Sequence, residues 1–450
     1  MTIFDHQRLA PDVFKLDVER MRAGWYSDQY FANIIGMLTD LAHQGYRFGG
    51  TSPYLDDLDI DLQSVDIGNL VVEMQWFTRR KPFSVVAGVD KALAMLETCT
   101  GYLEDGVFHS TWDRLQVEAV QDGTIVHYGG DPRQVEPVIK VRGRYRDFAL
   151  VETPTLGALT RGTRVATNVY NVLVAAHGKS VLFFPARFDA HEVQAADGYA
   201  YNIAVQRFNH DFAQQTGSFI STDAQGDWWG GFGGGTIAHA AIAAFLGDTA
   251  ETMMAFAATR PVDVSRIALV DFLNDCVGTT LDVMDKMFAR YKVLMDAGCE
   301  AEAQKFKLFG VRPDTGGTMR DVSVPPIGAK KVDMGVNPRL CFFLRSAIDS
   351  AWQRWNLEGD WLQRGQEWCR DVKIVVTGGF SPAKIRRFEE LNVPVDIYGV
   401  GSSLFSNSDA DGTNNDFTAD IVRVQIEGRW YNMAKVGRQP CGNPMLERIQ

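Results

Sequence analysis

Cysteine is scarce in this chain of 450 residues. Its six cysteines are scattered, and no two of them form a Cys-x-x-Cys pair. Structural zinc sites and disulfide scaffolds both depend on clustered or regularly spaced cysteines. The sequence therefore predicts neither kind of site.

Positive charge is also in short supply. There are 45 Lys and Arg residues against 56 Asp and Glu residues, which gives a net charge of −11. Proteins that bind nucleic acids or anionic membrane surfaces attract phosphate with surplus Lys and Arg. We therefore expect no nucleic-acid and no membrane partner. A local basic pocket for one small phosphorylated ligand remains compatible with this composition.

Long apolar runs are missing as well. The first residues, MTIFDHQRLAPDVFKLD, contain no basic segment followed by an apolar one, as a secretory signal would. The most apolar helix-like stretch, 236–247, is far shorter than the roughly 20 residues that span a bilayer. With 46% hydrophobic and 22% charged residues, the composition is that of a soluble globular protein, which we expect to be cytoplasmic.

The first part of the chain has a mixed pattern. Residues 17–41 show helical periodicity, and short alternating runs follow from residue 108, among them VFHSTW, RLQVEAV and EPVIKVRG. The tail over 420–450 returns to alternating strand character. We expect an N-terminal α/β sandwich-like domain over residues 1–150, which the tail rejoins.

Beyond residue 150, short apolar runs alternate with helix-like stretches. This alternation predicts parallel strands, and polar, glycine-rich groups follow nearly every run, as at the active-site face of a (β/α) barrel. The second domain, residues 151–419, is therefore predicted to be an α/β barrel. The runs predicted as strands are Ser180–Phe184, Arg266–Asp271, Lys307–Val311, Val372–Val376 and Val395–Tyr398.

Five glycines precede a helix-like segment in GGFGGGTIAH. Thr236 is the predicted N-cap, which places His239 in the first helical turn. Glycines and a helix N-terminus suit phosphate, so His239 could bind phosphate, donate a proton or accept a phosphoryl group. A buried helix with a hydrogen-bonded core histidine explains the same string equally well, and both readings stay open.

Two cations stand at the ends of predicted strands. Arg312 and Asp314 lie two residues apart in VRPDTGG, and Phe184 and Arg187 end the run in LFFPAR. Such residues suit a planar, anionic substrate with hydroxyl groups. A surface ion pair at the first place, and a core phenylalanine with a surface arginine at the second, are the alternatives.

Two further strands run into glycine turns. Gly378-Gly379 follows KIVVT, and Gly399-Val400-Gly401-Ser402 follows VDIY. Successive turns of this kind are typical of phosphate-binding loops late in barrels, although ordinary strand-to-helix turns look similar. No His-x-x-x-His, Gly-x-Ser-x-Gly, Walker A or Rossmann pattern is present, so no metal site made by protein side chains alone is predicted.

Taken in order, these motifs resemble the nicotinate phosphoribosyltransferase family, the type II phosphoribosyltransferases, with its nicotinamide-using relatives. The ordered motifs are SDQY, ETPTLGALTRGTRVATN, FFPAR, STD, GGGTIAH, VRPDTGG, VVTGGF and YGVGSS. The resemblance implies an irregular (β/α) barrel beside the N-terminal domain, in a homodimer with shared active sites. It also implies transfer of phosphoribose from phosphoribosyl pyrophosphate to nicotinate in NAD salvage. The implied co-reactants are Mg²⁺ and ATP, whose hydrolysis is coupled through a phosphohistidine.

The resemblance also assigns roles to residues. His239 resembles the phosphorylated histidine, while Asp314, and less securely Asp271, would contact the ribose or the Mg²⁺–pyrophosphate group. Tyr30 would reach the neighbouring subunit's site, with Phe184 on the other face of the pyridine. Arg187 and Arg312 would hold the base or its phosphoribosyl partner. The implied cradle for the 5-phosphate consists of Gly378, Gly379, Gly399, Gly401 and Ser402.

Some positions depart from the family pattern. Phe188 stands where many nicotinate-using members have a second arginine. Asp223 matches the aspartate that reads the carboxamide in the nicotinamide-using relatives, or else it caps a turn. We expect nicotinate as the base, with nicotinamide as the alternative because of Asp223. A nucleotide-binding relative without turnover is a further alternative.

Overall fold

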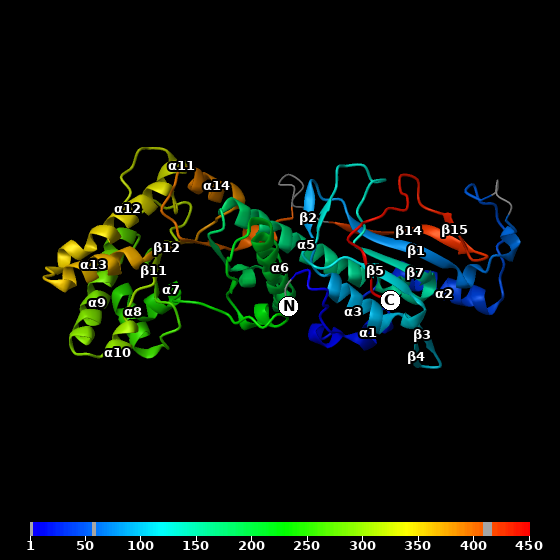
Figure 1. Cartoon of the computed structure of the whole chain (residues 1–450), viewed down its shortest axis with the longest axis horizontal. Coiled ribbons are helices and arrows are strands. Elements are labelled where there is room, and N and C mark those ends of the chain that lie inside the picture. Colours follow the sequence, from blue (N-terminus) through cyan, green and yellow to red (C-terminus); the bar gives the residue numbers. More distant parts are fainter. Residues whose placement is uncertain (1–2, 56–59, 408–415) are drawn as a thin grey trace. The chain divides into compact units, whose positions relative to one another are not determined.

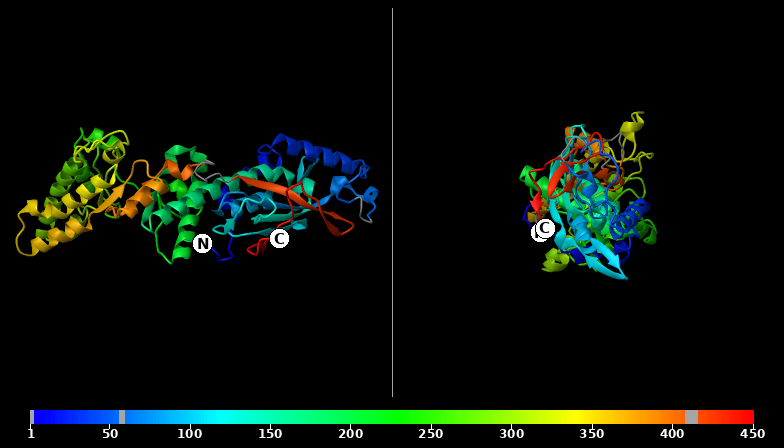
Figure 2. Two further views of the ribbon diagram at one scale, coloured as in Figure 1. Left: turned by 90° about the horizontal axis from the view of Figure 1, so that it is seen from above. Right: turned by 90° about the vertical axis from the view of Figure 1, so that its right-hand side faces the viewer.

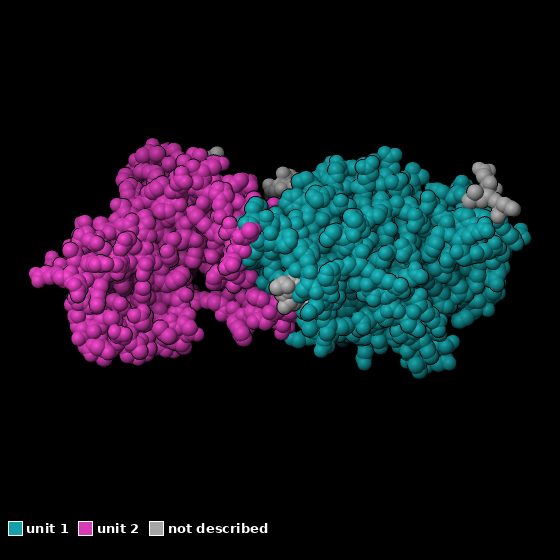
Figure 3. All heavy atoms as spheres, viewed as in Figure 1, with its two compact units in different colours: residues 1–170, 199–212, 406–450 teal, residues 171–198, 213–405 magenta. Residues whose placement is uncertain are grey.

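The computed structural model describes residues 3–55, 60–407 and 416–450, and the chain divides into two compact units (Figures 1 and 3). Unit 1 consists of residues 1–170, 199–212 and 406–450, and unit 2 of residues 171–198 and 213–405. The sequence placed the boundaries at 150 and 420. In the structure, unit 1 also takes up a helical segment from beyond residue 150.

Unit 1 is built on a six-stranded sheet with the order β15-β14-β1-β7-β5-β16. The late strand β14 pairs antiparallel with β1 from Thr78 to Val71, and β7 pairs antiparallel with the other side of β1. Figure 1 shows these three strands side by side. The strands are β1 (Val71–Thr78), β5 (Gln116–Ala119), β7 (Ile139–Arg144), β14 (Phe417–Ile426), β15 (Arg429–Asn432) and β16 (Glu447–Arg448).

One face of this sheet forms the core of unit 1. Val72, Met74 and Trp76 alternate along β1 and are buried with residues of α3 (Val89–Cys99). The Trp76 ring is fully buried, and its Nε1–H donates to Thr155 Oγ1 at 3.1 Å. Thr155 lies in α5 (Glu152–Ala175), so a helical layer is fixed to the sheet by a satisfied buried polar contact.

The helix predicted over 17–41 is interrupted. The structure has α1 (Val18–Arg22) and α2 (Gln29–His43), with Gly24 between them at φ +75°. A left-handed residue ends a helix, so the prediction of one continuous helix was wrong. α2, the long blue helix in Figure 2, contacts α4 (Tyr145–Phe148) in the same unit. The unit also has two small two-stranded antiparallel sheets: β2 (Phe83–Val85) with β6 (Ile125–His127), and the hairpin of β3 (Gly101–Glu104) with β4 (Val107–Ser110).

Unit 2 is built on a second six-stranded sheet, with the order β10-β11-β12-β13-β8-β9. Every neighbouring pair is parallel, as the alternation of strands and helices predicted. Five of the six strands lie on predicted runs, and only the short β9 was missed. The strands are β8 (Ser180–Phe183), β9 (Phe219–Ile220), β10 (Ile267–Leu269), β11 (Gly310–Arg312), β12 (Lys373–Val376) and β13 (Ile397–Val400).

The α/β class is confirmed, but the sheet is a curled half-barrel with β9 and β10 as its edges. Beyond β9, Gly233 forms an isolated parallel bridge with Ile220. The glycine-rich segment thus lies where a further strand would otherwise begin.

Helices follow the strands of unit 2. α14 begins at Pro382, and the Ser381 side chain accepts a hydrogen bond from the Lys384 N–H. Thr236 is not an N-cap, because α7 begins at His239 after Ala238. α6 (Gln194–Phe212) passes from unit 2 into unit 1 at residue 199. The other helices are α7 (His239–Ala244), α8 (Thr249–Thr259), α9 (Cys276–Asp296), α10 (Glu300–Gln304), α11 (Lys330–Asp333), α12 (Pro338–Ser350), α13 (Asp360–Asp371) and α14 (Pro382–Glu390).

Among the helices of the described residues, none combines the length and apolar character needed to cross a membrane.

Candidate active site

The predicted site residues of unit 2 gather at the carboxyl ends of its parallel strands. Phe184 directly follows β8, Asp271 follows β10, and Arg312 is the last residue of β11. Gly378 follows β12, and Ser402 follows β13. Parallel strands place these ends at one edge of a sheet, where ligands bind in α/β proteins.

A hydroxyl group connects the two charged residues of VRPDTGG. Thr377 Oγ1 donates to Asp314 Oδ1 at 2.7 Å, and Arg312 Nη1 donates to Thr377 Oγ1 at 3.3 Å. Arg312 Nη1 also lies 3.6 Å from Asp314 Oδ2, and its Nη2 donates to the Ile237 carbonyl at 3.1 Å. The guanidinium and the carboxylate are therefore held in a fixed geometry. Thr377 was not among the predicted site residues, although its place before Gly378 gave a signal.

Arg187 lies close enough to this cluster to affect the pKa of Arg312. Burial lowers the pKa of Arg312, repulsion from Arg187 lowers it further, and Asp314 and Asp271 act in the opposite direction. Two guanidinium groups that repel one another gain stability when an anion binds between them. Arg187 itself is exposed and lies over the ring of Phe188, at 5.4 Å from the ring centroid. The chemistry of this edge therefore suits an anionic ligand.

His239 is paired with a carboxylate. Its Nε2 lies 3.0 Å from Asp271 Oδ1, and its side chain is 48% exposed against 10% for Asp271. Burial raises the pKa of Asp271 and Asp314 contributes, while His239 opposes the rise. A carboxylate that holds one imidazole nitrogen leaves the other nitrogen free to react. The arrangement is that of an oriented, solvent-accessible histidine.

The glycine turns differ in detail. Gly378 and Gly379 both have positive φ, at +92° and +65°, and a Cβ on Gly378 would lie 3.5 Å from Asp314 Oδ1. Gly399 lies inside β13, where a Cβ would meet Thr377 Cγ2 at 2.5 Å. A Cβ on Gly401 would meet the Phe188 ring at 2.7 Å. Only the first turn therefore needs glycine for its backbone conformation, whereas the second needs it for space.

Lys384 supports the first glycine turn and was missed by the sequence reasoning. Its Nζ donates to the Gly378 carbonyl at 3.1 Å and lies 4.0 Å from the centroid of the Phe380 ring. Burial lowers the pKa of Lys384 to about 8. Ser403 Oγ donates to the Phe380 carbonyl at 2.8 Å, which connects the two turns. The turn after β12 is thus fixed through its own carbonyl groups.

A cavity of about 520 Å³ lies in the concave side of the half-barrel. Every strand of the sheet contributes to its wall, and Phe184 and Arg312 line it together with the glycine-rich segment 232–236. The lining is mostly apolar, with one guanidinium, Arg312, and one carboxylate, Asp263. Such a cavity accommodates a flat apolar ring, with Arg312 available to an anionic group on it. The lining side chains from the strands include Leu182, Ile220, Ile267, Val375 and Ile397.

Two predicted residues lie elsewhere. Asp223 is exposed, and its Oδ1 accepts a hydrogen bond from the Gly233 N–H at 2.9 Å. Tyr30 lies in α2 of unit 1, is exposed, and donates to Asp28 Oδ2 at 3.3 Å. The hydrogen bond from Gly233 thus agrees with the alternative interpretation, in which Asp223 caps a turn.

The donor set fits Mg²⁺ only together with a substrate. Among the described residues, no group of three His, Cys, Asp or Glu side chains could hold a metal ion. Asp314 and Asp271 are close enough to influence one another electrostatically. Mg²⁺ is commonly bound by one or two carboxylates and by substrate phosphates, so this pair fits a pyrophosphate-bound ion.

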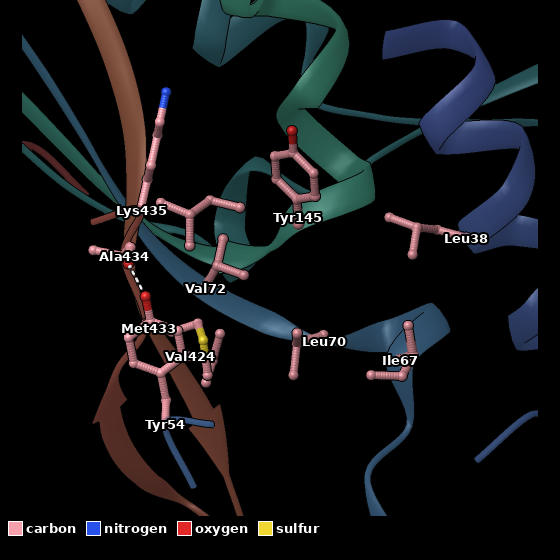
Figure 4. Close-up of a pocket in the computed structure, with 11 residues that line it drawn as sticks. Leu38, Tyr54, Ile67, Leu70, Val72, Tyr145, Val424, Met433, Ala434 and Lys435 are labelled. Carbon is pink, nitrogen blue, oxygen red and sulfur yellow. Dashed lines mark hydrogen bonds between the residues drawn. The ribbon is translucent and has the colours of Figure 1, made fainter. Parts of the chain in front are cut away.

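Unit 1 has a pocket of another kind, of about 460 Å³ (Figure 4). Figure 4 shows Leu38, Leu70, Val72 and Val424 around it, and Tyr54 donates to the Ala434 carbonyl at 3.0 Å. Its lining contains no carboxylate and no histidine. The charged residues of the candidate site, Arg312, Asp314, His239 and Asp271, belong to unit 2.

Comparison with known proteins finds a family model that matches part of unit 1 and solved structures with a similar fold. The family model "Quinolinate phosphoribosyl transferase, N-terminal domain" matches residues 59–162. A nicotinate-nucleotide pyrophosphorylase from Pyrococcus furiosus is similar in structure, with a TM-score of 0.59 and 23% identity over 94% of this chain and 79% of that one. Human nicotinic acid phosphoribosyltransferase is similar with a TM-score of 0.53 and 15% identity, over 90% and 76% of the two chains. No curated protein sequence matches the chain.

At these identities the two structures show a common fold, and the family model adds a match in sequence. The ordered motifs predicted the same relationship independently. The resemblance is thus supported in two ways: residues 59–162 match the quinolinate phosphoribosyl transferase N-terminal model in sequence, and the chain shares the fold of the two solved structures.

Proposed function

We propose that the protein transfers phosphoribose from phosphoribosyl pyrophosphate to nicotinate, giving nicotinate mononucleotide and pyrophosphate. The observation that carries this proposal is the cluster of Arg312, Thr377 and Asp314. It lies between a cavity for a flat ring and a glycine turn suited to phosphate.

The cavity favours a pyridine carboxylate. Phe184 offers an aromatic face and Arg312 a guanidinium to the same cavity. Nicotinate has the matching pair of features, a planar ring and a carboxylate. The resemblance implies an aspartate as the reader of nicotinamide, and here Asp223 Oδ1 accepts a hydrogen bond from Gly233.

The transfer itself exchanges one bond for another. The pyridine nitrogen forms a bond to the anomeric carbon, and the bond from that carbon to the pyrophosphate oxygen breaks. The leaving group takes the electron pair, so Arg187 and Arg312 stabilise charge that grows in the transition state. Asp314 holds the ribose or the Mg²⁺–pyrophosphate group, and Mg²⁺, when bound, supplies further charge neutralisation.

We further propose that His239 accepts a phosphoryl group from ATP through its Nδ1. Its Nε2 is held by Asp271, which leaves Nδ1 as the free nucleophile. The γ-phosphoryl group would pass to Nδ1 with release of ADP, and water would later remove it. The test is transfer of label from γ-labelled ATP to the wild-type protein but not to His239→Asn. Equal labelling of both would refute this role.

The decisive experiment compares three bases. Mononucleotide formation is measured with nicotinate, nicotinamide and quinolinate, each with phosphoribosyl pyrophosphate and Mg²⁺, with and without ATP. The proposal expects product from nicotinate and stimulation by ATP. If no base gives product, the proposed enzymatic activity is refuted, and a nucleotide-binding protein without turnover is favoured.

Quinolinate is the second candidate because the matching family model bears its name. Arg187 and Arg312 could take its two carboxylates. Its reaction would also release CO2, so CO2 formation with quinolinate and no product with nicotinate would replace the first candidate by the second.

The proposed homodimer has its own test. Tyr30 and Arg312 are replaced separately by alanine, and the two variants are unfolded, mixed and refolded. If Tyr30 of one copy completes the site of another, the refolded mixture recovers about a quarter of the wild-type activity, because half of its dimers are mixed and each mixed dimer has one intact site of two. No recovery from mixed dimers would reject the shared site.

A further inference from the structure

Phe232 combines two properties that are rarely found together. It is 86% exposed, yet it lines the same cavity as Phe184 and Arg312. A large apolar ring left in water gains free energy when a ligand covers it. The ring is therefore available to whatever binds in the cavity.

The backbone on both sides of Phe232 is held in place. Before it, the N–H groups of Gly230 and Gly231 donate to the Gly226 carbonyl at 2.8 and 3.2 Å. After it, the Gly233 N–H donates to Asp223 Oδ1 at 2.9 Å, and the Gly234 N–H donates to the Ile220 carbonyl at 2.8 Å. The position of the ring is thus set from two sides, while the ring itself is free.

Close packing explains the glycines around it. A Cβ on Gly231 would meet the Trp229 ring at 2.4 Å, and one on Gly233 would meet the Thr222 carbonyl carbon at 2.7 Å. In the segment 230–235 only Phe232 has a side chain, so it alone can contact a ligand by that means.

We propose that Phe232 forms a second aromatic wall of the base site and covers the bound pyridine ring, and that Asp223 anchors the segment that carries it. This inference rests on the proposed function. It assigns to the chain's own loop a contact that the family resemblance would give to Tyr30. Asp223 is then a positioning residue, which affects the binding of nicotinate and of nicotinamide equally.

The test compares binding of nicotinate and nicotinamide by isothermal titration calorimetry with steady-state kinetics. Phe232→Ala should raise Kd and KM for the base by about 10-fold, with KM for phosphoribosyl pyrophosphate unchanged. Phe232→Tyr should restore base affinity because it keeps the ring. Leu246→Ala is the matched control, since Leu246 is an apolar side chain that is 98% exposed and does not line the cavity.

A second pair of variants tests the anchor. Asp223→Ala should weaken both bases equally, and Asp223→Asn should preserve both affinities because its amide oxygen still accepts from Gly233. A selective loss of nicotinamide in Asp223→Asn would overturn the anchor role. Wild-type base affinity in Phe232→Ala would overturn the aromatic wall. If the wild-type protein binds no pyridine base, the proposed function fails instead.

Discussion

At the scale of single residues, the Thr377 hydroxyl connects the charged groups of the candidate site. It is buried, and it lies between a guanidinium and a carboxylate. Hydrogen bonds to charged groups contribute more than neutral ones, and leaving a buried charged partner unsatisfied is costly. The reactive geometry therefore depends on a residue that carries no charge itself.

Replacement of Thr377 by valine keeps the shape of the side chain and removes the hydroxyl. We expect kcat/KM for phosphoribosyl pyrophosphate to fall by about 10- to 100-fold, which corresponds to about 1.5–3 kcal/mol for hydrogen bonds to charged groups. Thr377→Ser retains the hydroxyl and should stay near wild type. Initial rates measure both variants, and equal activity of the valine and serine variants would contradict this role.

Lys384 predicts a pH dependence at the first glycine turn. Because burial lowers its pKa to about 8, the ammonium loses its proton and its charge as the pH rises through that value. We expect KM for phosphoribosyl pyrophosphate to rise above pH 8 and Lys384→Arg to shift the rise to higher pH, since arginine stays charged. Lys373→Arg is the control, because Lys373 begins β12 far from the turn after that strand. If KM depends on pH in the same way in the wild type and in Lys384→Arg, the charge of Lys384 has no such role.

At the scale of elements, pattern strength decided what the sequence could predict. The buried parallel strands of unit 2 were found because each is a continuous run of apolar residues. β9 has two residues, which is too short for any pattern. β1 was missed because Glu73 and Gln75 interrupt its apolar residues. Glu73 is buried in an ion pair with Arg142, across the sheet.

The residues of the candidate site also divide into those that the sequence predicted and those that it missed. Arg312 was predictable because it ends a strand, and His239 because it follows a glycine-rich segment at the start of a helix. Lys384 was missed although Gly378, which it contacts, lies only six positions away. Thr377 was missed because it meets Arg312 and Asp314 across 65 and 63 positions of sequence, and Phe232 because it lines a cavity together with Arg312. Such pairings are set by the sheet order and not by local spacing.

The glycine turn after β12 can be tested as an element. Gly378 has φ +92°, a conformation that costs a residue with a Cβ about 1–2 kcal/mol. Gly378→Ala should lower the thermal stability and weaken binding of phosphoribosyl pyrophosphate. Gly442→Ala is the control, because Gly442 lies outside the candidate site, has no left-handed φ, and has nothing within 4 Å of its added Cβ. Equal effects of the two substitutions would mean that the turn has no special conformational role.

At the scale of the whole molecule, unit 1 contains buried charge of its own. Asp122 accepts hydrogen bonds from the Val89 N–H at 2.9 Å and the Tyr199 hydroxyl at 3.1 Å. Asp90 lies beside it and is paired with Arg8 at 3.0 Å. Burial and the neighbouring Asp90 raise the pKa of Asp122. The group joins the first residues of the chain, α3 and α6 into one buried network.

This network predicts the direction of a pH effect on folding. The native state keeps the Asp122 proton at pH values where the unfolded chain has lost it. The contribution of Asp122 to stability therefore falls as the pH rises above the ordinary carboxyl range. Asp122→Asn should flatten the dependence, measured by urea unfolding between pH 4.5 and 7.5. Parallel curves for the two proteins would contradict the assignment.

The pairing of β14 with β1 also determines the order of assembly during translation. All six strands of unit 2 leave the ribosome before β14 does, although β1 and β7 are synthesised much earlier. One side of β1 therefore stays unpaired in the nascent chain until residue 426 has emerged. An open strand edge recruits other chains, so we expect chaperones to matter most for unit 1 during synthesis.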